Sequence, residues 1–245
     1  MPARLSADVD RFLSQVDVGA DARAPKALIV PHAGYVYSGI VAAHGYAQLR
    51  GGSLRQIVLF GPAHFVPLRG LALPEAEAFG TPLGSVPIDA ELADQLAKAL
   101  GIGRNSAAHA REHSLEVHLP FLQCILRDFR IVPLVVGRAP AKDVALAMDA
   151  AWGDAATVIL VSSDLSHYLP YEDAVDLDRR TADQILALGP PLADEQACGA
   201  RAINGLLLAA AKHRLQPKLL DIRNSGDTAG SRDEVVGYAS IAFYE

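Results

Sequence analysis

Cysteines and long apolar runs are scarce in this sequence. Only two cysteines, Cys124 and Cys198, occur among 245 residues. Two cysteines close at most one bridge, too few to stabilise a chain of this length, so we expect both to be reduced. The longest apolar stretch, at residues 206–211, is far too short to span a bilayer, and residues 1–10 lack the apolar core of a signal peptide. We therefore expect a cytoplasmic protein.

Basic clusters and nucleotide-binding motifs are also missing. The formal net charge is −6, and no long run of Lys and Arg occurs. Nucleic acids and anionic membranes bind clustered positive charge, so we expect neither as a partner. No Gly-x-Gly-x-x-Gly follows an expected strand, no Gly-x-Ser-x-Gly occurs, and the glycine-rich loop 224–230 lacks the lysine of a P-loop. These absences disfavour a dinucleotide enzyme and an α/β-hydrolase.

The pattern that remains predicts an α/β fold. Hydrophobic residues make up 51% of the chain, enough for a large core. Short apolar runs alternate with helical patterns, which favours a central, mostly parallel sheet with helices on both faces. We expect one domain, residues 1–245, because no segment resembles a linker. The expected strands are 26–31, 55–60, 130–136 and 156–162, with an antiparallel pair at 217–223 and 233–244 and short extended pieces within 68–89. The expected helices are 5–16, 38–49, 90–100, 113–128, 140–151, 173–188 and 198–213.

Three of these strands lead into a polar break that carries a histidine: His32, His64 and His167. Ligands of open parallel sheets bind outside the carboxyl ends of the strands, so the three imidazoles could converge. Imidazole is the commonest protein metal ligand and an acid or base near neutral pH. A metal or acid/base site is therefore expected at this edge, although each histidine alone is equally compatible with a structural turn.

Two further residues near these strand ends have a chemical and a structural interpretation. Asp164 could orient a neighbouring histidine through its second ring nitrogen, or it could cap the turn that follows. Cys198 stands at the start of the expected helix 198–213, whose N-terminal partial charge favours a reactive thiolate and metal ligand. It could also be a small buried hydrophobe, as Cys124 is expected to be.

A polar cluster enters the expected helix 113–128. His113 and Glu116 are three residues apart and would share a face that could line a cleft and supply acid/base groups. A solvated helix face is the alternative interpretation of the same spacing.

The ordered motifs of the chain, from about residue 25 to the end, resemble those of the Memo family, called AmmeMemoRadiSam system protein B in bacteria and archaea. The motifs that carry the resemblance are Pro31-His32-Ala33-Gly34-Tyr35, Gly61-Pro62-Ala63-His64, Thr81-Pro82-Leu83-Gly84, Glu112-His113-Ser114-Leu115-Glu116, Ser162-Ser163-Asp164-Leu165-Ser166-His167-Tyr168, Ala197-Cys198-Gly199, Asn224-Ser225-Gly226-Asp227 and Val236-Gly237-Tyr238. Ala63 departs from the pattern, where we would expect Ser.

This resemblance implies a fold like that of class III extradiol dioxygenases, which hold iron through two histidines and a carboxylate. In the Memo family a cysteine takes the carboxylate's place. Carried over by motif, the metal ligands would be His32, His64 and Cys198, and His167 would be a further active-site histidine. Such a ligand set suits iron or copper, and zinc as well.

Two classes of function follow from these expectations. The first is a metal-dependent oxidoreductase of unknown substrate, in which His167, Asp164, His113 and Glu116 supply acid/base groups; classical extradiol cleavage is a weaker version of it. The second is a non-catalytic adaptor that binds a peptide or small molecule. The family resemblance implies AMMECR-like and radical-SAM pathway proteins as partners.

Overall fold

The computed structural model describes residues 2–18 and 24–245. Four neighbouring strands at the centre of the main sheet run parallel, in the order β1 (Ala27–Val30), β8 (Thr157–Ser162), β2 (Gln56–Pro62) and β7 (Arg130–Val136). They correspond to the four expected parallel strands. All are almost wholly buried, as strands covered on both faces are.

The outer strands make the sheet mixed. At one side β11 (Val235–Tyr244) runs antiparallel to β1, and β10 (Gln216–Asn224) extends it as the expected antiparallel pair. At the other side β3 (Leu71–Leu73) runs antiparallel to β7 and pairs with β6 (Gly103–Arg104). The short strand β9 (His167–Leu169) adds to β11, and β4 (Ala78–Thr81) and β5 (Gly84–Pro87) form a separate hairpin.

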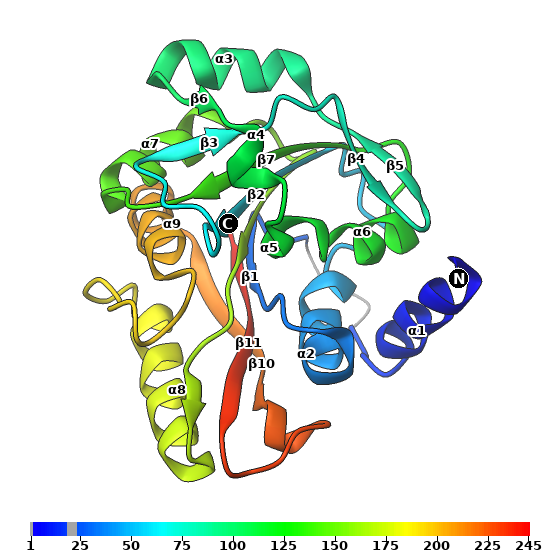
Figure 1. Ribbon diagram of the computed structural model, residues 1–245, viewed down its shortest axis with the longest axis vertical. Coiled ribbons are helices and arrows are strands. Elements are labelled where there is room, and N and C mark those ends of the chain that lie inside the picture. The colour runs from blue at the N-terminus through cyan, green and yellow to red at the C-terminus, as the bar shows by residue number, and fades with distance from the viewer. Residues whose placement is uncertain (1, 19–23) are drawn as a thin grey trace.

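Helices cover both faces of the sheet, as expected (Figure 1). Along β1, Ala27 and Ile29 face one core, whereas Leu28 and Val30 face the other. The first core is closed by α3 (Ala90–Leu100), α7 (Ala141–Ala150), α8 (Tyr171–Leu186) and α9 (Ala200–His213). The second is closed by α1 (Pro2–Ser14), α2 (Tyr35–Ala47), α5 (His113–Glu116) and α6 (Leu119–Ile125). Within the described ranges, no helix has the length and apolar character to cross a membrane.

Individual residues explain where helices begin and end. Asp89 caps α3 by accepting a hydrogen bond from the backbone N–H of Leu92 at 3.0 Å, as its residue type indicated. The expected helix 113–128 is wrong as one element, because it is divided into α5 and α6. Pro120 lies in the first turn of α6, where its missing N–H leaves no helical hydrogen bond unmade. A single-turn helix, α4 (Ser106–His109), and a 3₁₀ turn, η1 (Ser225–Asp227), complete the elements.

Candidate metal centre at the carboxyl edge of the sheet

Two of the predicted histidines meet at the carboxyl edge of the parallel strands. His32 follows the end of β1 by two residues, and His64 follows the end of β2 in the same way. The centroids of the two imidazole rings are 5.2 Å apart. The structure therefore brings together the pair that the strand-end pattern indicated.

The third imidazole of this cluster comes from His113, the first residue of α5. Its ring centroid lies 5.6 Å from that of His32 and 5.2 Å from that of His64, and it stacks on the latter with planes 17° apart. One ring nitrogen from each of these residues lies within 4.8 Å of the others. We name His32, His64 and His113 the histidine cluster. A residue predicted only for acid/base chemistry thus lies in metal-binding geometry.

His32 is fixed by neighbouring strand ends and is only 3% exposed. Its Nδ1 lies 2.7 Å from the hydroxyl oxygen of Ser162, and its backbone N–H donates to Oδ1 of Asp164 at 2.8 Å. Burial, together with the charges of His64 and His113, lowers the pKa of His32 to about 3. The ring is therefore neutral at physiological pH, and its Nε2 faces the cluster.

His64 is held by a single buried carboxylate, that of Glu112. Nδ1 of His64 lies 2.9 Å from Oε1 of Glu112, and the backbone N–H of His64 donates to Oε2 at 2.7 Å. The backbone N–H of Ser114 adds a third contact at 3.0 Å. Burial alone would raise the pKa of Glu112, but these hydrogen bonds outweigh it and bring the pKa to about 2. Sequence reasoning assigned Glu112 no role, although it stands directly before His113.

Cys198 borders the cluster on its buried side. Its Sγ lies 3.5 Å from Nε2 of His32 and accepts a hydrogen bond from the backbone N–H of Asp164 at 3.3 Å. Gly199 permits this approach, because a Cβ there would stand 2.6 Å from the carbonyl oxygen of Ser162.

The helix N-terminus does not make Cys198 a ready thiolate. The helix begins only at Ala200, and burial together with the Asp164 carboxylate raises the pKa of the Cys198 thiol to about 12. Burial therefore opposes the acidity that the position near a helix start indicated. Cys124 lies partly buried against the second core, and burial raises the pKa of its thiol as well.

The remaining predicted residues lie at different distances from the cluster. Asp164 is buried beside His32; burial raises its pKa to about 6, against the hydrogen bonds from His32 and Ala33. His167 lies on the exposed strand β9, and its charge still acts on Asp164 and His32. It flanks the histidine cluster.

The structure does not bring Glu116 into the cluster. It is exposed and lines another pocket, with Glu75, Phe79 and His109. His113 and Glu116 do lie in the same single turn, α5, but the ring of His113 joins the cluster whereas Glu116 borders the other pocket. The buried carboxylate of this segment is that of Glu112.

The donor set of the cluster fits a metal ion. Histidines that ligate metals usually present one ring nitrogen to the ion and engage the other with a carboxylate or another polar group. His64 and His32 have this arrangement, through Glu112 and Ser162. The three histidines can therefore bind a metal. The Cys198 sulfur is not part of this converging group but lies beside it, 3.5 Å from Nε2 of His32.

Comparison with known proteins supplies the family. A profile described as Memo-like protein matches residues 1–242. The chain is similar to a MEMO1 family protein of Caldivirga maquilingensis, with 38% identity over 89% of this chain and 83% of the relative. It is 36% identical to one of Sulfolobus acidocaldarius, over 90% and 83%. A crystal structure of the uncharacterized protein JW3007 from Escherichia coli K12 shares the fold, with a TM-score of 0.54 and 16% identity over 88% of this chain and 99% of that one. The chain belongs to the Memo-like protein family.

Proposed function

We propose that this protein is a metal-dependent oxidoreductase whose ion is held by the histidine cluster and Cys198. The observation that carries the proposal is the convergence of three imidazole nitrogens within 4.8 Å, with a thiol sulfur 3.5 Å from Nε2 of His32. Imidazole and sulfur donors together suit iron, copper and zinc. We favour iron or copper, because these ions exchange electrons and zinc does not.

The residues around the ion have separate roles in this proposal. A bound redox metal would supply Lewis-acid and electron-transfer chemistry. In this proposal Asp164 is the acid/base group on the buried side, where burial raises the pKa of its carboxyl. His167, on the exposed side, exchanges protons with solvent and with a bound substrate. Glu112 and Ser162 fix the orientation of the ligand rings.

Metal analysis of protein purified without oxygen tests the proposal. We expect close to one iron or copper ion per chain, and oxygen consumption when a panel of catechols and other reducing substrates is added. The matched control is His32→Ala, which should lack both the ion and the oxygen consumption. Protein that contains no metal and binds none from added iron, copper or zinc salts would refute the metal site.

A non-catalytic ligand-binding role is the second candidate, and a specific observation favours it. Aromatic side chains are exposed near the cluster: Phe65, next to His64, is 47% exposed and Tyr168, next to His167, is 70% exposed. Exposed aromatic residues are frequent anchors of protein and peptide contacts. In this proposal the partners are a peptide, a small molecule, or the AMMECR-like and radical-SAM proteins of the same organism.

Sedimentation of mixtures of the purified proteins separates the two candidates. An adaptor forms a complex with one of these partners, and His32→Ala forms it equally well, because the contact does not require the ion. No complex with either partner, together with metal-dependent turnover, would leave the oxidoreductase as the function.

A further inference from the structure

A pocket of about 610 Å³ opens beside the histidine cluster; His64 of the cluster and the neighbouring Cys198 both line it. Its walls come from the loop after β2, the end of β7 and the start of α9. The carboxyl end of β7 lies at the same edge of the sheet as those of β1 and β2, which is where ligands of parallel sheets bind. A molecule in this pocket would reach the proposed metal centre.

The pocket carries an excess of positive charge. Three arginines line it, Arg69, Arg138 and Arg201, against a single carboxylate, Asp194. Arg201 is paired with that carboxylate at 2.7 Å. In the part of the chain that the structure describes, Arg69 and Arg138 have no ion-pair partner. Two guanidinium groups therefore remain available to an anionic ligand.

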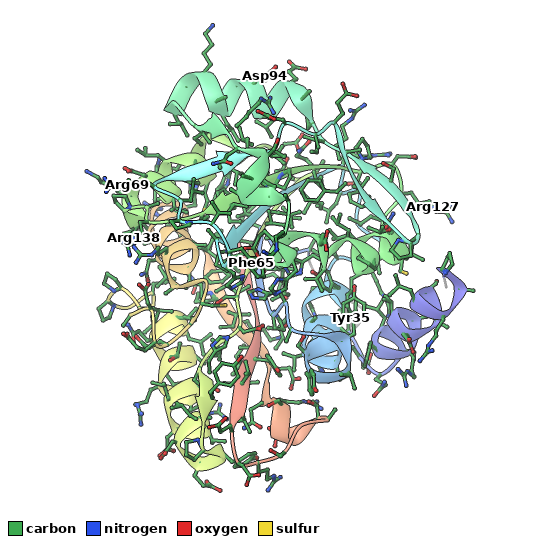
Figure 2. All side chains as sticks on the ribbon, in the orientation of Figure 1. Tyr35, Phe65, Arg69, Asp94, Arg127 and Arg138 are labelled. Carbon is green, nitrogen blue, oxygen red and sulfur yellow. The ribbon has the colours of Figure 1, made fainter. Side chains whose placement is uncertain are left out.

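Arg69 and Arg138 lie opposite each other on paired backbone. They form a parallel β-bridge, and backbones paired in this way lie about 4.8 Å apart. Like charges placed directly opposite each other repel, and an anion bound between them removes that cost. Figure 2 shows both arginines at the same edge of the molecule, with Phe65 between them and the centre of the view.

The backbone beneath these arginines is held in place. The N–H of Arg138 donates to the carbonyl of Leu68 at 2.8 Å, and the N–H of Gly137 donates to that of Gly70 at 2.9 Å. A Cβ on Gly137 would stand only 2.2 Å from the carbonyl oxygen of Leu68. The close approach of the two backbone segments at this point therefore requires glycine. The two guanidinium groups thus project from a fixed base.

Apolar side chains also line the pocket. Phe65, Val66, Pro67, Leu68 and Ala202 line the pocket between the arginines and the cluster. The Phe65 ring is braced by the guanidinium of Arg111, which lies 5.1 Å from its centroid. An apolar wall beside paired guanidinium groups suits a ligand with a flat apolar body and one charged end.

We propose that this pocket binds a small organic carboxylate with a flat apolar body. The carboxylate lies between Arg69 and Arg138, and the opposite end of the molecule lies at His64 and Cys198. This assignment rests on the proposed function, since it names the substrate class of that metal centre. We favour an organic carboxylate over inorganic phosphate because the apolar side chains of the pocket would contact an organic body, which phosphate lacks.

Calorimetric titration of metal-free protein with benzoate, benzamide and inorganic phosphate tests the charge requirement. We expect saturable binding of benzoate, and at least roughly tenfold weaker binding of benzamide, because a hydrogen bond to a charged group contributes about 1.5–3 kcal/mol. Equal binding of benzoate and benzamide would overturn the proposal. Phosphate that binds more tightly than benzoate would overturn the carboxylate assignment.

Arginine variants test the location. Arg69→Gln and Arg138→Gln should each weaken benzoate binding about tenfold, whereas Arg127→Gln should not, because Arg127 lies at the opposite edge of the molecule in Figure 2. Circular dichroism of each variant checks that it is folded. Unchanged benzoate affinity in both pocket variants would refute the assignment.

The same titration repeated with zinc-loaded protein separates this inference from the proposed function. If benzoate binds at the arginines but the protein retains no metal, the metal centre is refuted and the carboxylate pocket is not. Metal retained at the histidine cluster, with no benzoate binding in either form, would refute the carboxylate pocket alone.

Discussion

The two sides of the histidine cluster are built differently. On one side the His32 ring is 3% exposed and is held at the ends of β1 and β8, where Val30 is in register with Ser162. On the other side the side chains of His64 and His113 are 27% and 48% exposed and lie on connecting segments. One side is therefore fixed by the sheet, whereas the other is fixed by side chains that reach over the sheet edge.

This contrast indicates which part of the site a substitution would disrupt most easily. The exposed side depends on Glu112, whose carboxylate bonds the backbone and ring of His64 and the backbone of Ser114. The hydroxyl of Ser114 in turn donates to the carbonyl of Pro62, at the end of β2, at 3.1 Å. We therefore expect the buried side to set whether a metal binds, and the exposed side to adjust how tightly it is held.

His32→Ala should have the largest effect on metal affinity. Replacing a residue that hydrogen-bonds a metal ligand already costs roughly 10–100-fold in metal affinity. Replacing the buried ligand itself should therefore cost more than about 100-fold. Competition with a chromophoric chelator measures the affinity. The matched control is His44→Ala, a histidine that contacts Asp221 outside the cluster and should leave the affinity unchanged. Equal affinities of the two variants would contradict the ligand role of His32.

Glu112→Gln should have the next largest effect, about 10–100-fold on metal affinity. The variant keeps the shape of the side chain but removes the charge that anchors His64. The folded state lowers the pKa of Glu112 from its ordinary 4.5 to about 2. The carboxylate therefore contributes stability above about pH 4.5, and that contribution is lost as the pH falls towards 2.

Urea unfolding across this pH range checks the prediction. The stability difference between the wild type and Glu112→Gln should be full at pH 6 and should shrink as the pH falls through 4 to 2. A difference that is constant with pH would show that the charge of Glu112 is not what stabilises the loop.

His113→Ala should have a smaller effect, about tenfold, because the side chain is nearly half exposed, so that water can replace it on the ion, and its Nδ1 lies 3.8 Å from Oε1 of Glu112, too far for a hydrogen bond. Cys198→Ser is the informative companion, since the hydroxyl occupies similar space but is a poorer donor to copper and zinc. We expect His113→Ala to weaken all metals alike and Cys198→Ser to weaken copper and zinc selectively. The reverse result would place the sulfur outside the ligand set. Competition titrations with iron, copper and zinc make the comparison.

The smallest effect on metal content is expected for His167→Ala. Its ring lies on β9 beside the cluster and acts on Asp164 and His32 only through its charge. Metal content should stay within error of the wild type, while oxygen consumption or ligand affinity changes. His44→Ala, a histidine that contacts Asp221 outside the cluster, is again the control. Loss of the ion in His167→Ala would make this histidine a direct ligand.

Much of the fold could be predicted from local patterns. Each central strand is a continuous apolar run, and residue types such as Asp89 mark helix starts, because burial and capping act over a few neighbouring residues. The strands β6 and β9 could not be predicted, since they are two and three residues long and exist only through pairing with β3 and β11. Pro120 signalled a helix break, but not that a separate single-turn helix would precede it.

The sequence by itself indicated that His32 and His64 could meet, because parallel strands end at the same edge and both residues follow strand ends. The same argument also included His167, which is not among the three converging histidines. It did not determine the third imidazole. His113 joins the cluster only because the short helix α5 folds over the end of β2, where Glu112 and Ser114 hold it. The tertiary structure also decided the surroundings of Cys198, where burial and the nearby Asp164 raise the pKa of the thiol. Contacts and burial between segments far apart in the chain leave no local pattern, so only the folded arrangement fixes them.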